Sequence, residues 1–552
     1  MTLAQSIMLG ILYFLANSNL TMISYVTIYR PLVGGFITGL ILGDPVTGTM
    51  VGATINMMFI GFISAGGALP SDMALAGILG TALAITGGLD ANAALAIAVP
   101  LGLLGTLVWV GRMTFDSFFN RWTDKIVASG SLKGLWLPTI WIPQLFLFCI
   151  TGIPVMLACY FGADAVANVI NALGSTVMGV LFTIGGIMPA LGIAITLKFI
   201  FKGDNKPFFF LGFLLAAYSG LSMIGIGFFS LLIALIYTQV ISHIDEAKAA
   251  AASSDEEFGF DLGDDDSEDA PEVALTEEEA KPSKRLSKNS LIRSFFTWEW
   301  SYQACYNYEN MQAGCFLDAM APAINELYAD DPEEYKRACA RHFEFYNIEN
   351  TTGGAVLGLV LAMEEQRASG QDVTEDAIRS VKTGLMGPLS GIGDSTVQGV
   401  ILPLALSFAI SMAQDGSPVP VVIYVIFMAA VQLGLAWFMF NLGYKQGSNA
   451  IIDLLESGTF KNAIAAAGIL GCTVMGALIV NYVSCSCAIQ IPQGSDMFSV
   501  QTGFLDVICP GLLPLLVTLL AYKLVEKGWS SVKVLGVLVL IAIVGNLCGI
   551  LA

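Results

Sequence analysis

The order of hydrophobic and polar positions divides the chain into two long apolar blocks with a polar stretch between them. The first block covers about residues 3–242 and the second about residues 383–552. Within the blocks lie apolar runs at about 3–29, 32–69, 73–111, 137–161, 167–197, 207–242, 383–412, 418–441, 461–483, 503–524 and 534–552. Because about 20 predominantly apolar residues cross a bilayer as a helix, the pattern predicts an all-α integral membrane protein.

Several of these runs are too long for one crossing and are interrupted by glycine. Examples are GGFITGLILGDPVTGTMVG in the first block and TGLMGPLSGIGDSTVQG in the second. Irregular backbone at membrane depth is tolerated only where protein or a water-filled cavity satisfies its polar groups. Interrupted helices of this kind line substrate sites in transporters. We therefore expect a polytopic helical bundle with broken or re-entrant helices.

The stretch between the blocks is acidic. From Asp245 to Glu279 there are fifteen Asp or Glu residues and one basic residue, Lys248. Such a segment cannot bury enough apolar surface to order itself, so we expect a disordered acidic linker over residues 243–284 that joins two membrane modules. With 55% hydrophobic and 12% charged residues overall, the rest of the chain is far poorer in charge than a soluble protein.

The linker sets the predicted domain boundaries. Residues 1–242 form the first membrane module and residues 382–552 the membrane helices of the second. Residues 285–381 are charged and aromatic, and we expect them to form cytoplasmic or interfacial amphipathic helices. Within that region Asp331 and Pro332 predict the start of a helix.

The distribution of Lys and Arg predicts the orientation of the chain. Basic clusters lie at Arg112, Arg121, Lys125 and Lys133, at Lys198, Lys202 and Lys206, at Lys281, Lys284, Arg285, Lys288 and Arg293, at Lys445 and Lys461, and at Lys523, Lys527 and Lys533. Short loops rich in these residues stay in the cytoplasm. All clusters face one side if residues 207–242 go out and back as a hairpin. The linker is then cytoplasmic and the C-terminus external.

Charge and composition exclude several classes of function. Of the net charge of −19, residues 245–279 carry −14, which leaves about −5 and no basic surface for nucleic acid. No phosphate-binding P-loop is present, and two His residues exclude a His-rich metal site. We expect His342 to be a packed structural residue. The sequence indicates no cofactor, no metal and no catalytic group of its own.

Polar residues inside apolar runs are the candidates for ligand binding, since an ionisable group costs at least about 2.5–3.5 kcal/mol in lipid. Asn56, Asp72 and Phe62 could bind a neutral sugar, with amide and carboxylate groups on its hydroxyls and a ring against its face. The alternative is that an Asp next to a Gly or Pro break caps a helix. We favour the cap for Asp44 and leave both interpretations open for Asp72.

Longer motifs resemble a known family. The stretch YRPLVGGFITGLILGDPVTGTMVGATINMMFIGFISAGGALPSDMALAG (29–77) and KPFFFLGFLLAAY (206–218) resemble the IIC component of the mannose/fructose/sorbose family of phosphotransferase-system permeases. The stretches NYENMQAGCFLDAMAPAI (307–324), RHFEFYNIENTTGGAVLGLVLAMEEQRASG (341–370) and VKTGLMGPLSGIGDSTVQGVILP (381–403) resemble the IID component. The two components are commonly separate chains and look fused here.

The resemblance implies a function. Such a permease, in the bacterial cytoplasmic membrane, binds an external hexose or amino sugar and moves it inward. Partner IIA and IIB proteins carry the phosphoryl group on their own His residues and phosphorylate the sugar. The resemblance also implies a homotrimer. The substrate-binding positions that it carries over are Ser24, Thr27, Asn56, Ser64 and Asp72 in the first module and Asn307, Glu309, Gln312 and Asp394 in the second.

This sequence departs from mannose-type members in the first module, where only Asp72 of those positions keeps an acid. Loss of hydroxyl-binding carboxylates changes sugar preference, so N-acetylated amino sugars, sorbose and fructose all stay open. Two other functions also fit the residues. Broken helices with buried Asp residues are found in ion-coupled secondary transporters, and a depleted site would suit a sugar receptor that no longer transports.

Overall fold

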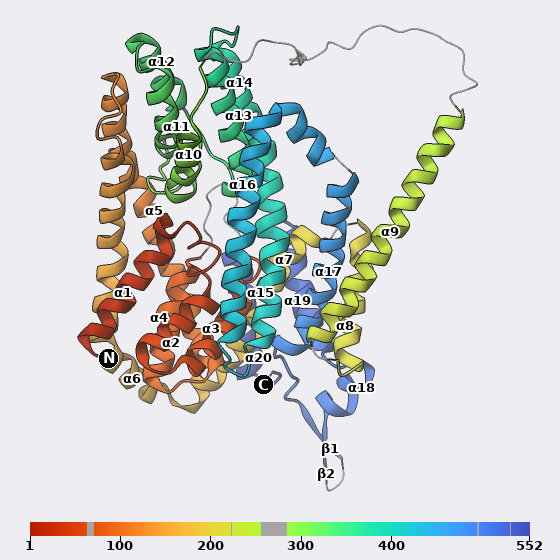
Figure 1. The fold of residues 1–552 in the computed structure, drawn as a ribbon. Coiled ribbons are helices and arrows are strands. Elements are labelled where there is room, and N and C mark those ends of the chain that lie inside the picture. The colour runs from red at the N-terminus through yellow and green to blue at the C-terminus, as the bar shows by residue number, and fades with distance from the viewer. Residues whose placement is uncertain are drawn as a thin grey trace.

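The computed structural model describes residues 1–62, 71–201, 203–221, 223–255, 284–456, 458–493, 496–529 and 531–551. Helices account for nearly all the secondary structure in these residues (Figure 1), which confirms the predicted all-α fold. The central part of the predicted acidic linker, residues 256–283, lies outside the described residues, and so does Ser64.

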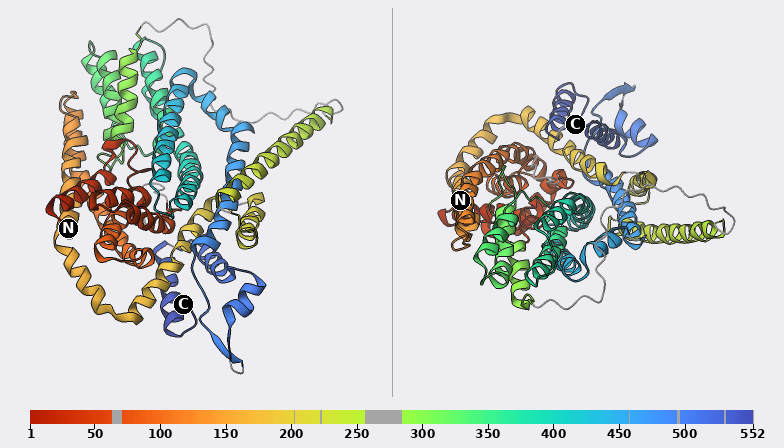
Figure 2. Two further views of the ribbon diagram at one scale, coloured as in Figure 1. Left: turned by 60° about the horizontal axis from the view of Figure 1, so that its bottom comes forward. Right: turned by 90° about the horizontal axis from the view of Figure 1, so that it is seen from above.

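The first block folds into helices of very different lengths. They are α1 (Leu3–Asn17), η1 (Asn19–Thr21), α2 (Pro31–Leu42), α3 (Pro45–Phe59), α4 (Met73–Gly87), α5 (Ala91–Ala128), η3 (Leu137–Trp141), α6 (Ile142–Ile187), α7 (Pro189–Ile200), η4 (Gly203–Asn205), α8 (Lys206–Tyr218) and α9 (Met223–Asp255). Helices α8 and α9 both pack against α17 of the second block. In Figures 1 and 2 the far end of α9 extends away from the other helices.

Local sequence explains the short helices α2 and α3. Pro31 opens α2, and Gly43 ends it with a φ of 87°, a left-handed conformation that favours glycine. The side chain of Asp44 then caps α3 by accepting a hydrogen bond from the Thr47 backbone N–H at 3.0 Å. This confirms the predicted cap at Asp44 and the predicted interruption of the long apolar run.

The second block contains α10 (Lys288–Ser301), α11 (Ala313–Leu327), α12 (Pro332–His342), α13 (Asn350–Ala368), α14 (Glu375–Gly393), η5 (Asp394–Ile401), α15 (Leu402–Met412), α16 (Val419–Glu456), α17 (Gly458–Tyr482), η6 (Gln501–Leu505), α18 (Asp506–Ile508), α19 (Leu512–Glu526) and α20 (Ser531–Leu547). Strands β1 (Gln490–Gln493) and β2 (Asp496–Ser499) form an antiparallel hairpin. Asp331 caps α12, which confirms the helix start predicted there.

Five helices in the described residues are long and apolar enough to cross a membrane. They are Ala91–Ala128, Leu137–Gly162, Glu375–Met412, Val419–Lys445 and Ala465–Tyr482, and a bent pair, Gln501–Ile508 with Leu512–Glu526, would add a sixth. The third of these starts at α14, so the boundary expected between residues 381 and 382 falls inside one continuous helix. Likewise, the boundary expected at residue 242 falls inside α9.

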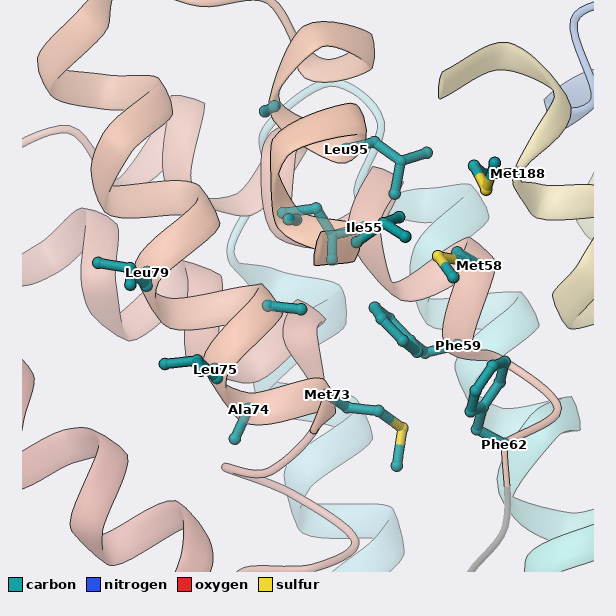
Figure 3. Packing of buried hydrophobic residues seen from close by; sticks show 14 of the residues in the cluster. Ile55, Met58, Phe59, Phe62, Met73, Ala74, Leu75, Leu79, Leu95 and Met188 are labelled. Atoms are coloured by element: carbon teal, nitrogen blue, oxygen red, sulfur yellow. The ribbon is translucent and has the colours of Figure 1, made fainter. Parts of the chain in front are cut away.

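Residues of the first block dominate one apolar core and residues of the second block another, while a third core draws on both blocks. In the first core, Figure 3 shows Met58, Phe59 and Phe62 between Met188 and Met73. In the second, aromatic rings of α10, α11 and the chain after α12 pack together: the ring centroids of Phe316 and Tyr346 are 4.3 Å apart, and Trp298 lies 5.7 Å from Tyr346. Apolar packing in these cores fixes the positions of the chain segments where the two blocks meet.

A buried ion-pair network joins α12 to α13. Glu364 accepts hydrogen bonds from Nε and Nη2 of Arg341, both at 2.6 Å, and pairs with Nε2 of His342 at 2.7 Å. Glu334 accepts from Arg341 at 2.9 Å and from Arg367 at 2.8 Å. His342 is fully buried in this network, which confirms its predicted structural role.

Candidate functional site

The two blocks meet at a loop of the second block, residues 302–312, that lies against α5, α6 and η1 of the first. Arg112 donates through Nη2 to the carbonyl of Gln303, and Gln144 donates through Nε2 to the carbonyl of Ala304 at 3.1 Å. The Arg112 guanidinium also donates through Nη1 to the carbonyl of Asn17 at 3.2 Å. The first block therefore fixes the backbone of this loop.

Beside the loop lies a small cavity with walls from both blocks. Its volume is about 50 Å³. The lining combines aromatic, amide and carboxylate side chains with a few apolar ones: Tyr25, Val26, Tyr302, Gln303, Tyr306, Gln312, Asn347, Ile348, Glu349, Asn350, Ser390, Asp394, Val397, Gln398 and Gln432. Only Tyr25 and Val26 come from the first block. Such a polar and aromatic lining suits a neutral, hydroxyl-rich ligand.

A short chain of hydrogen bonds connects the two walls. The hydroxyl of Tyr25 donates to Oε1 of Gln398 at 2.9 Å, and Nε2 of Gln398 donates to Oδ1 of Asp394 at 2.6 Å. Asp394 and Gln398 lie four residues apart in the π-helical segment η5 (Asp394–Ile401). π-helical turns occur frequently at functional sites, and this one places both side chains on the cavity.

The remaining wall is the segment that leads into α13. The side-chain amide of Gln312 makes two hydrogen bonds to the backbone of Ile348. Its Nε2 donates to the Ile348 carbonyl at 3.0 Å, and its Oε1 accepts from the Ile348 N–H at 2.8 Å. The hydroxyl of Tyr306 donates to Oδ1 of Asn347 at 2.7 Å. The Asn347 amide nitrogen thereby becomes the end of that side chain that can donate to a ligand.

A carboxyl group lies buried behind this wall. Glu299, near the end of α10, accepts a hydrogen bond from Nδ2 of Asn350 at 2.9 Å. Burial raises the pKa of Glu299 to about 8, opposed by the Asn350 hydrogen bond and reinforced by the charge of Glu349. The group is therefore largely neutral at pH 7. Burial likewise raises the pKa of the Tyr302 hydroxyl, which stays protonated.

Five residues predicted in the first block belong to the described part of the chain: Ser24, Thr27, Asn56, Phe62 and Asp72. They are buried and do not line this cavity, and Ser64 lies outside the described residues. Ser24 and Thr27 donate to the carbonyls of Ser18 and Ile23, both at 2.6 Å, on either side of the lining residues Tyr25 and Val26. The structure thus places two predicted residues next to the cavity in sequence while their hydroxyls serve the backbone.

Asn56, Phe62 and Asp72 lie deeper in the first block. Oδ1 of Asn56 accepts from the Leu32 N–H at 3.1 Å, and Phe62 packs in the apolar core. Asp72 caps α4 at the Leu75 N–H and also accepts the Tyr13 hydroxyl at 2.7 Å. The cap interpretation of Asp72 is therefore confirmed, and its second oxygen has a protein partner.

Of the residues predicted in the second block, two reach the cavity and two shape the loop beside it. Gln312 and Asp394 line the cavity. Oδ1 of Asn307 accepts from the backbone N–H groups of Glu309 and Asn310 at 3.0 and 2.9 Å, which folds the loop into a turn. Glu309 forms an ion pair with Arg121 of α5 at 3.4 Å.

Several residues that line the cavity were not predicted, although the sequence pattern indicated two of them. Gln398 and Gln432 are polar residues inside apolar runs, the same feature that singled out Asn56. Tyr25, Tyr306 and Asn347 carry no such signal, because they lie in polar or aromatic stretches where most side chains only pack. Their role depends on which loops the fold brings together.

Comparison with known proteins identifies both blocks. Residues 3–236 match the family model described as the PTS system sorbose-specific IIC component, and residues 285–551 match that of the PTS system mannose/fructose/sorbose family IID component. The chain belongs to the mannose/fructose/sorbose family of phosphotransferase-system permeases. It is a sugar permease and a multi-pass membrane protein in which a IIC half (residues 3–236) and a IID half (residues 285–551) are fused.

Individual relatives agree with this division. The IID half is 33% identical over 274 residues to the mannose-specific EIID component of Escherichia coli K12, a match that covers 49% of this chain and 96% of that protein. It is 31% identical to the sorbose-specific EIID component of Klebsiella pneumoniae, over 49% of this chain and 99% of that one. The IIC half is 31% identical over 229 residues to the E. coli K12 mannose-specific EIIC component, covering 41% and 85%.

Among solved structures, one chain from the complex of the mannose transporter ManYZ with microcin E492 is 31% identical. The match covers 49% of this chain and 99% of that chain, with a TM-score of 0.29. The family assignment therefore depends on the sequence matches.

Proposed function

We propose that the cavity between the IIC and IID halves binds the transported sugar, a neutral hexose or amino sugar, and that partner IIA and IIB proteins phosphorylate it. The observation that supports this most is the composition of the wall. Amide, carboxylate and tyrosine side chains of the IID half meet Tyr25 of the IIC half at one small space between the halves. A sugar hydroxyl both donates and accepts, and this lining offers partners for both.

The size of the cavity implies a movement. At about 50 Å³ the space holds a few water molecules, while ligand pockets of small molecules typically measure about 300–1,000 Å³. The walls must therefore separate before a sugar enters. Two of the bonds that cross between the halves at the cavity are Tyr25 to Gln398 at 2.9 Å and Tyr424 to the Val26 carbonyl at 2.6 Å. We infer that these bonds open when the sugar binds.

The state of His342 supports a phosphoryl donor outside this chain. A phosphoryl-carrying His needs an accessible ring nitrogen, and His342 is completely buried with Nε2 on Glu364. His243, at the start of the predicted linker, lies on α9 outside the cavity lining. The phosphoryl-carrying residues are then those of IIA and IIB.

The surroundings of the permease are also part of the proposal. We expect a bacterial cytoplasmic membrane, a cytoplasmic linker and a homotrimer. The basic clusters support the orientation. Exposed apolar side chains along one face of α16, among them Val422 at 48%, Ile423 at 55% and Ile426 at 64%, suit contact with lipid or with a neighbouring copy.

Sugar phosphate formed inside cells tests this function directly. Cells with this chain, with and without energised IIA and IIB, receive a panel of radiolabelled hexoses and amino sugars. We expect one sugar to accumulate as its phosphate only when IIA and IIB are present. Uptake of unmodified sugar that ignores IIA and IIB but collapses with an ionophore would establish an ion-coupled carrier instead. Sugar binding without either form of accumulation would establish a receptor.

A further inference from the structure

Two neighbouring residues of α10 hold Asn350, the first residue of α13. The indole Nε1 of Trp298 donates to the Asn350 carbonyl at 3.4 Å, and Oε2 of Glu299 accepts from the Asn350 side-chain Nδ2 at 2.9 Å. Trp298 and Glu299 are both completely buried, and Asn350 is 5% exposed. The backbone and the amide group of Asn350 are thus fixed from the same helix.

The orientation of the Asn350 amide leaves its oxygen for the cavity. Asn350 lines the cavity, and within the described residues its Oδ1 has no hydrogen-bond partner. Because Nδ2 donates to Oε2 of Glu299, Oδ1 is the atom of this amide that is left for the cavity. An amide oxygen that is buried and unsatisfied costs about 1–3 kcal/mol, which a ligand hydroxyl can recover.

Neighbouring Glu349 cannot take this role as it stands, since its carboxylate is already occupied. Oε2 accepts from the Thr352 N–H at 3.0 Å and both oxygens accept the Thr351 hydroxyl, which makes Glu349 the cap of α13. The oxygen of Asn350 is therefore an acceptor at this end of the cavity that the protein leaves open.

We propose that Glu299 is a positioning residue for sugar binding, which orients the Asn350 amide so that Oδ1 accepts a hydroxyl of the sugar. The inference rests on the proposed function of the cavity. Burial keeps Glu299 largely neutral at pH 7, with a pKa of about 8, so its role is that of a hydrogen-bond acceptor and not of a charge. A glutamine offers the same acceptor with nearly the same shape.

Kinetics of sugar phosphorylation by energised IIA and IIB, with the intact chain in membranes, test the inference. Glu299→Leu removes the acceptor and should raise KM about five- to tenfold while kcat stays within about twofold. Glu299→Gln should keep KM near that of the wild type. Among monodeoxy analogues of the transported sugar, the one that lacks the hydroxyl bound by Asn350 should show the same KM with wild type and Glu299→Leu.

Two further measurements keep the inference open to refutation. If Glu299→Leu does not accumulate, Asn350→Ala tests the same acceptor and should show the same loss of discrimination against that one analogue. Exposed Asn325, on α11, provides the control Asn325→Ala, which should leave KM unchanged. Calorimetric binding of the sugar to the purified chain repeats the comparison without phosphoryl transfer.

The outcomes separate the inference from the proposed function. An unchanged KM in Glu299→Leu, or an equal rise for every deoxy analogue, would show that Glu299 only supports the fold. A wild-type chain that binds no sugar of the panel would overturn both the proposed function and this inference. A wild type that phosphorylates its sugar while Asn350→Ala keeps full discrimination would overturn the inference alone.

Discussion

Gln398 contacts both halves of the permease through one amide group. Its oxygen accepts the Tyr25 hydroxyl from the IIC half, and its nitrogen donates to Asp394 on its own helix turn. An amide is suited to this place because it donates and accepts at once, as a sugar hydroxyl does. In the proposed sugar complex, a sugar hydroxyl can replace either neighbour at the Gln398 amide.

Substitution of Gln398 tests this role. Gln398→Leu leaves the Tyr25 hydroxyl and Asp394 without their partner, and an unsatisfied buried group costs about 1–3 kcal/mol. We expect kcat/KM for sugar phosphorylation to fall about tenfold or more. Ser395→Ala on the same segment is the control, because the Ser395 hydroxyl is exposed and donates to the Gly391 carbonyl of its own helix. An equal or higher kcat/KM in Gln398→Leu would contradict a role in binding.

His342 makes the stability of the IID half depend on pH. Burial lowers its pKa to about 4, although the hydrogen bond to Glu364 opposes the shift. Since an unfolded His titrates near 6.5, the unfolded chain binds more protons between about pH 6.5 and 4. This stabilisation is complete above pH 6.5 and is lost as the pH falls towards 4. Glu364, whose pKa is held low by bonds from Arg341 and His342, loses its contribution at still lower pH.

Melting of the detergent-solubilised protein at pH 7 and pH 5 measures this effect. We expect the wild type to melt at a lower temperature at pH 5, and His342→Gln to show a smaller difference between the two pH values. Exposed Glu333, at the start of the same helix, supplies the control Glu333→Gln with a wild-type difference. An undiminished difference in His342→Gln would assign the acid sensitivity to other groups.

Single residues also show how much of the candidate site could be predicted from the sequence. A polar residue in an apolar run indicates that a hydrogen-bond partner satisfies it. This held for Asp72, for Gln398 and for Oδ1 of Asn56, whereas Nδ2 of Asn56 is buried without a hydrogen-bond partner in the described residues. Whether the partner is the protein or a ligand depends on neighbours that are distant in sequence. Asn56 and Asp72 meet protein groups, while Gln398 lies 373 positions from Tyr25 and borders the cavity.

Among elements, the contact of α13 with α16 depends on glycines. A Cβ atom on Gly443 would lie 2.0 Å from the Ala355 carbonyl oxygen, and one on Gly358 would lie 2.1 Å from the Phe440 carbonyl oxygen. Small residues let membrane helices approach until their backbones touch. Because α13 begins at Asn350, this contact also fixes the wall of the cavity.

Alanine substitutions along α16 should therefore have opposite effects. Gly443→Ala overpacks the contact, and we expect it to cost about 1–3 kcal/mol. Gly434→Ala, on the same helix where a Cβ would meet nothing within 4 Å, should be neutral or stabilising by up to about 1 kcal/mol. Melting temperatures of the two purified variants decide the question. A Gly443→Ala variant as stable as Gly434→Ala would mean that α13 and α16 can separate freely.

Helix starts were predictable at this scale because their causes are local. Asp44 with Pro45, and Asp331 with Pro332, carry the cap and the first turn in adjacent residues. The continuity of α14 with η5 and α15 was not predictable. Glycines at 384, 387 and 391 and Pro388 each predict a break, yet the helix continues through them, with α13 packed against it and open space beside the three glycines.

For the whole molecule, the two halves assemble through contacts that do not involve the linker. They meet at the loop 302–312, at the cavity and along the pairs α8 with α17 and α7 with α19. Relatives of each half are described as single EIIC and EIID components, and each match covers most of that protein. The fusion then raises the local concentration of one half around the other without being needed for the contact itself.

Co-expression of the halves as separate chains, divided within residues 256–283, tests this view. We expect them to co-purify and to support sugar phosphorylation at a level near that of the fused chain.

Tyr424→Phe removes the hydroxyl that donates to the Val26 carbonyl across the interface, and Tyr444→Phe removes one that donates to Glu365 within the IID half at 2.7 Å. A lost hydrogen bond of about 1 kcal/mol weakens association roughly fivefold. Joining two binding partners in one chain gives an effective concentration of up to the millimolar range, so the fused chain should tolerate that loss. Tyr424→Phe should therefore reduce co-purification of the separate halves, leave the fused chain active, and differ in both respects from Tyr444→Phe. Separate halves that never associate, even without substitution, would show that the linker itself is part of the assembly.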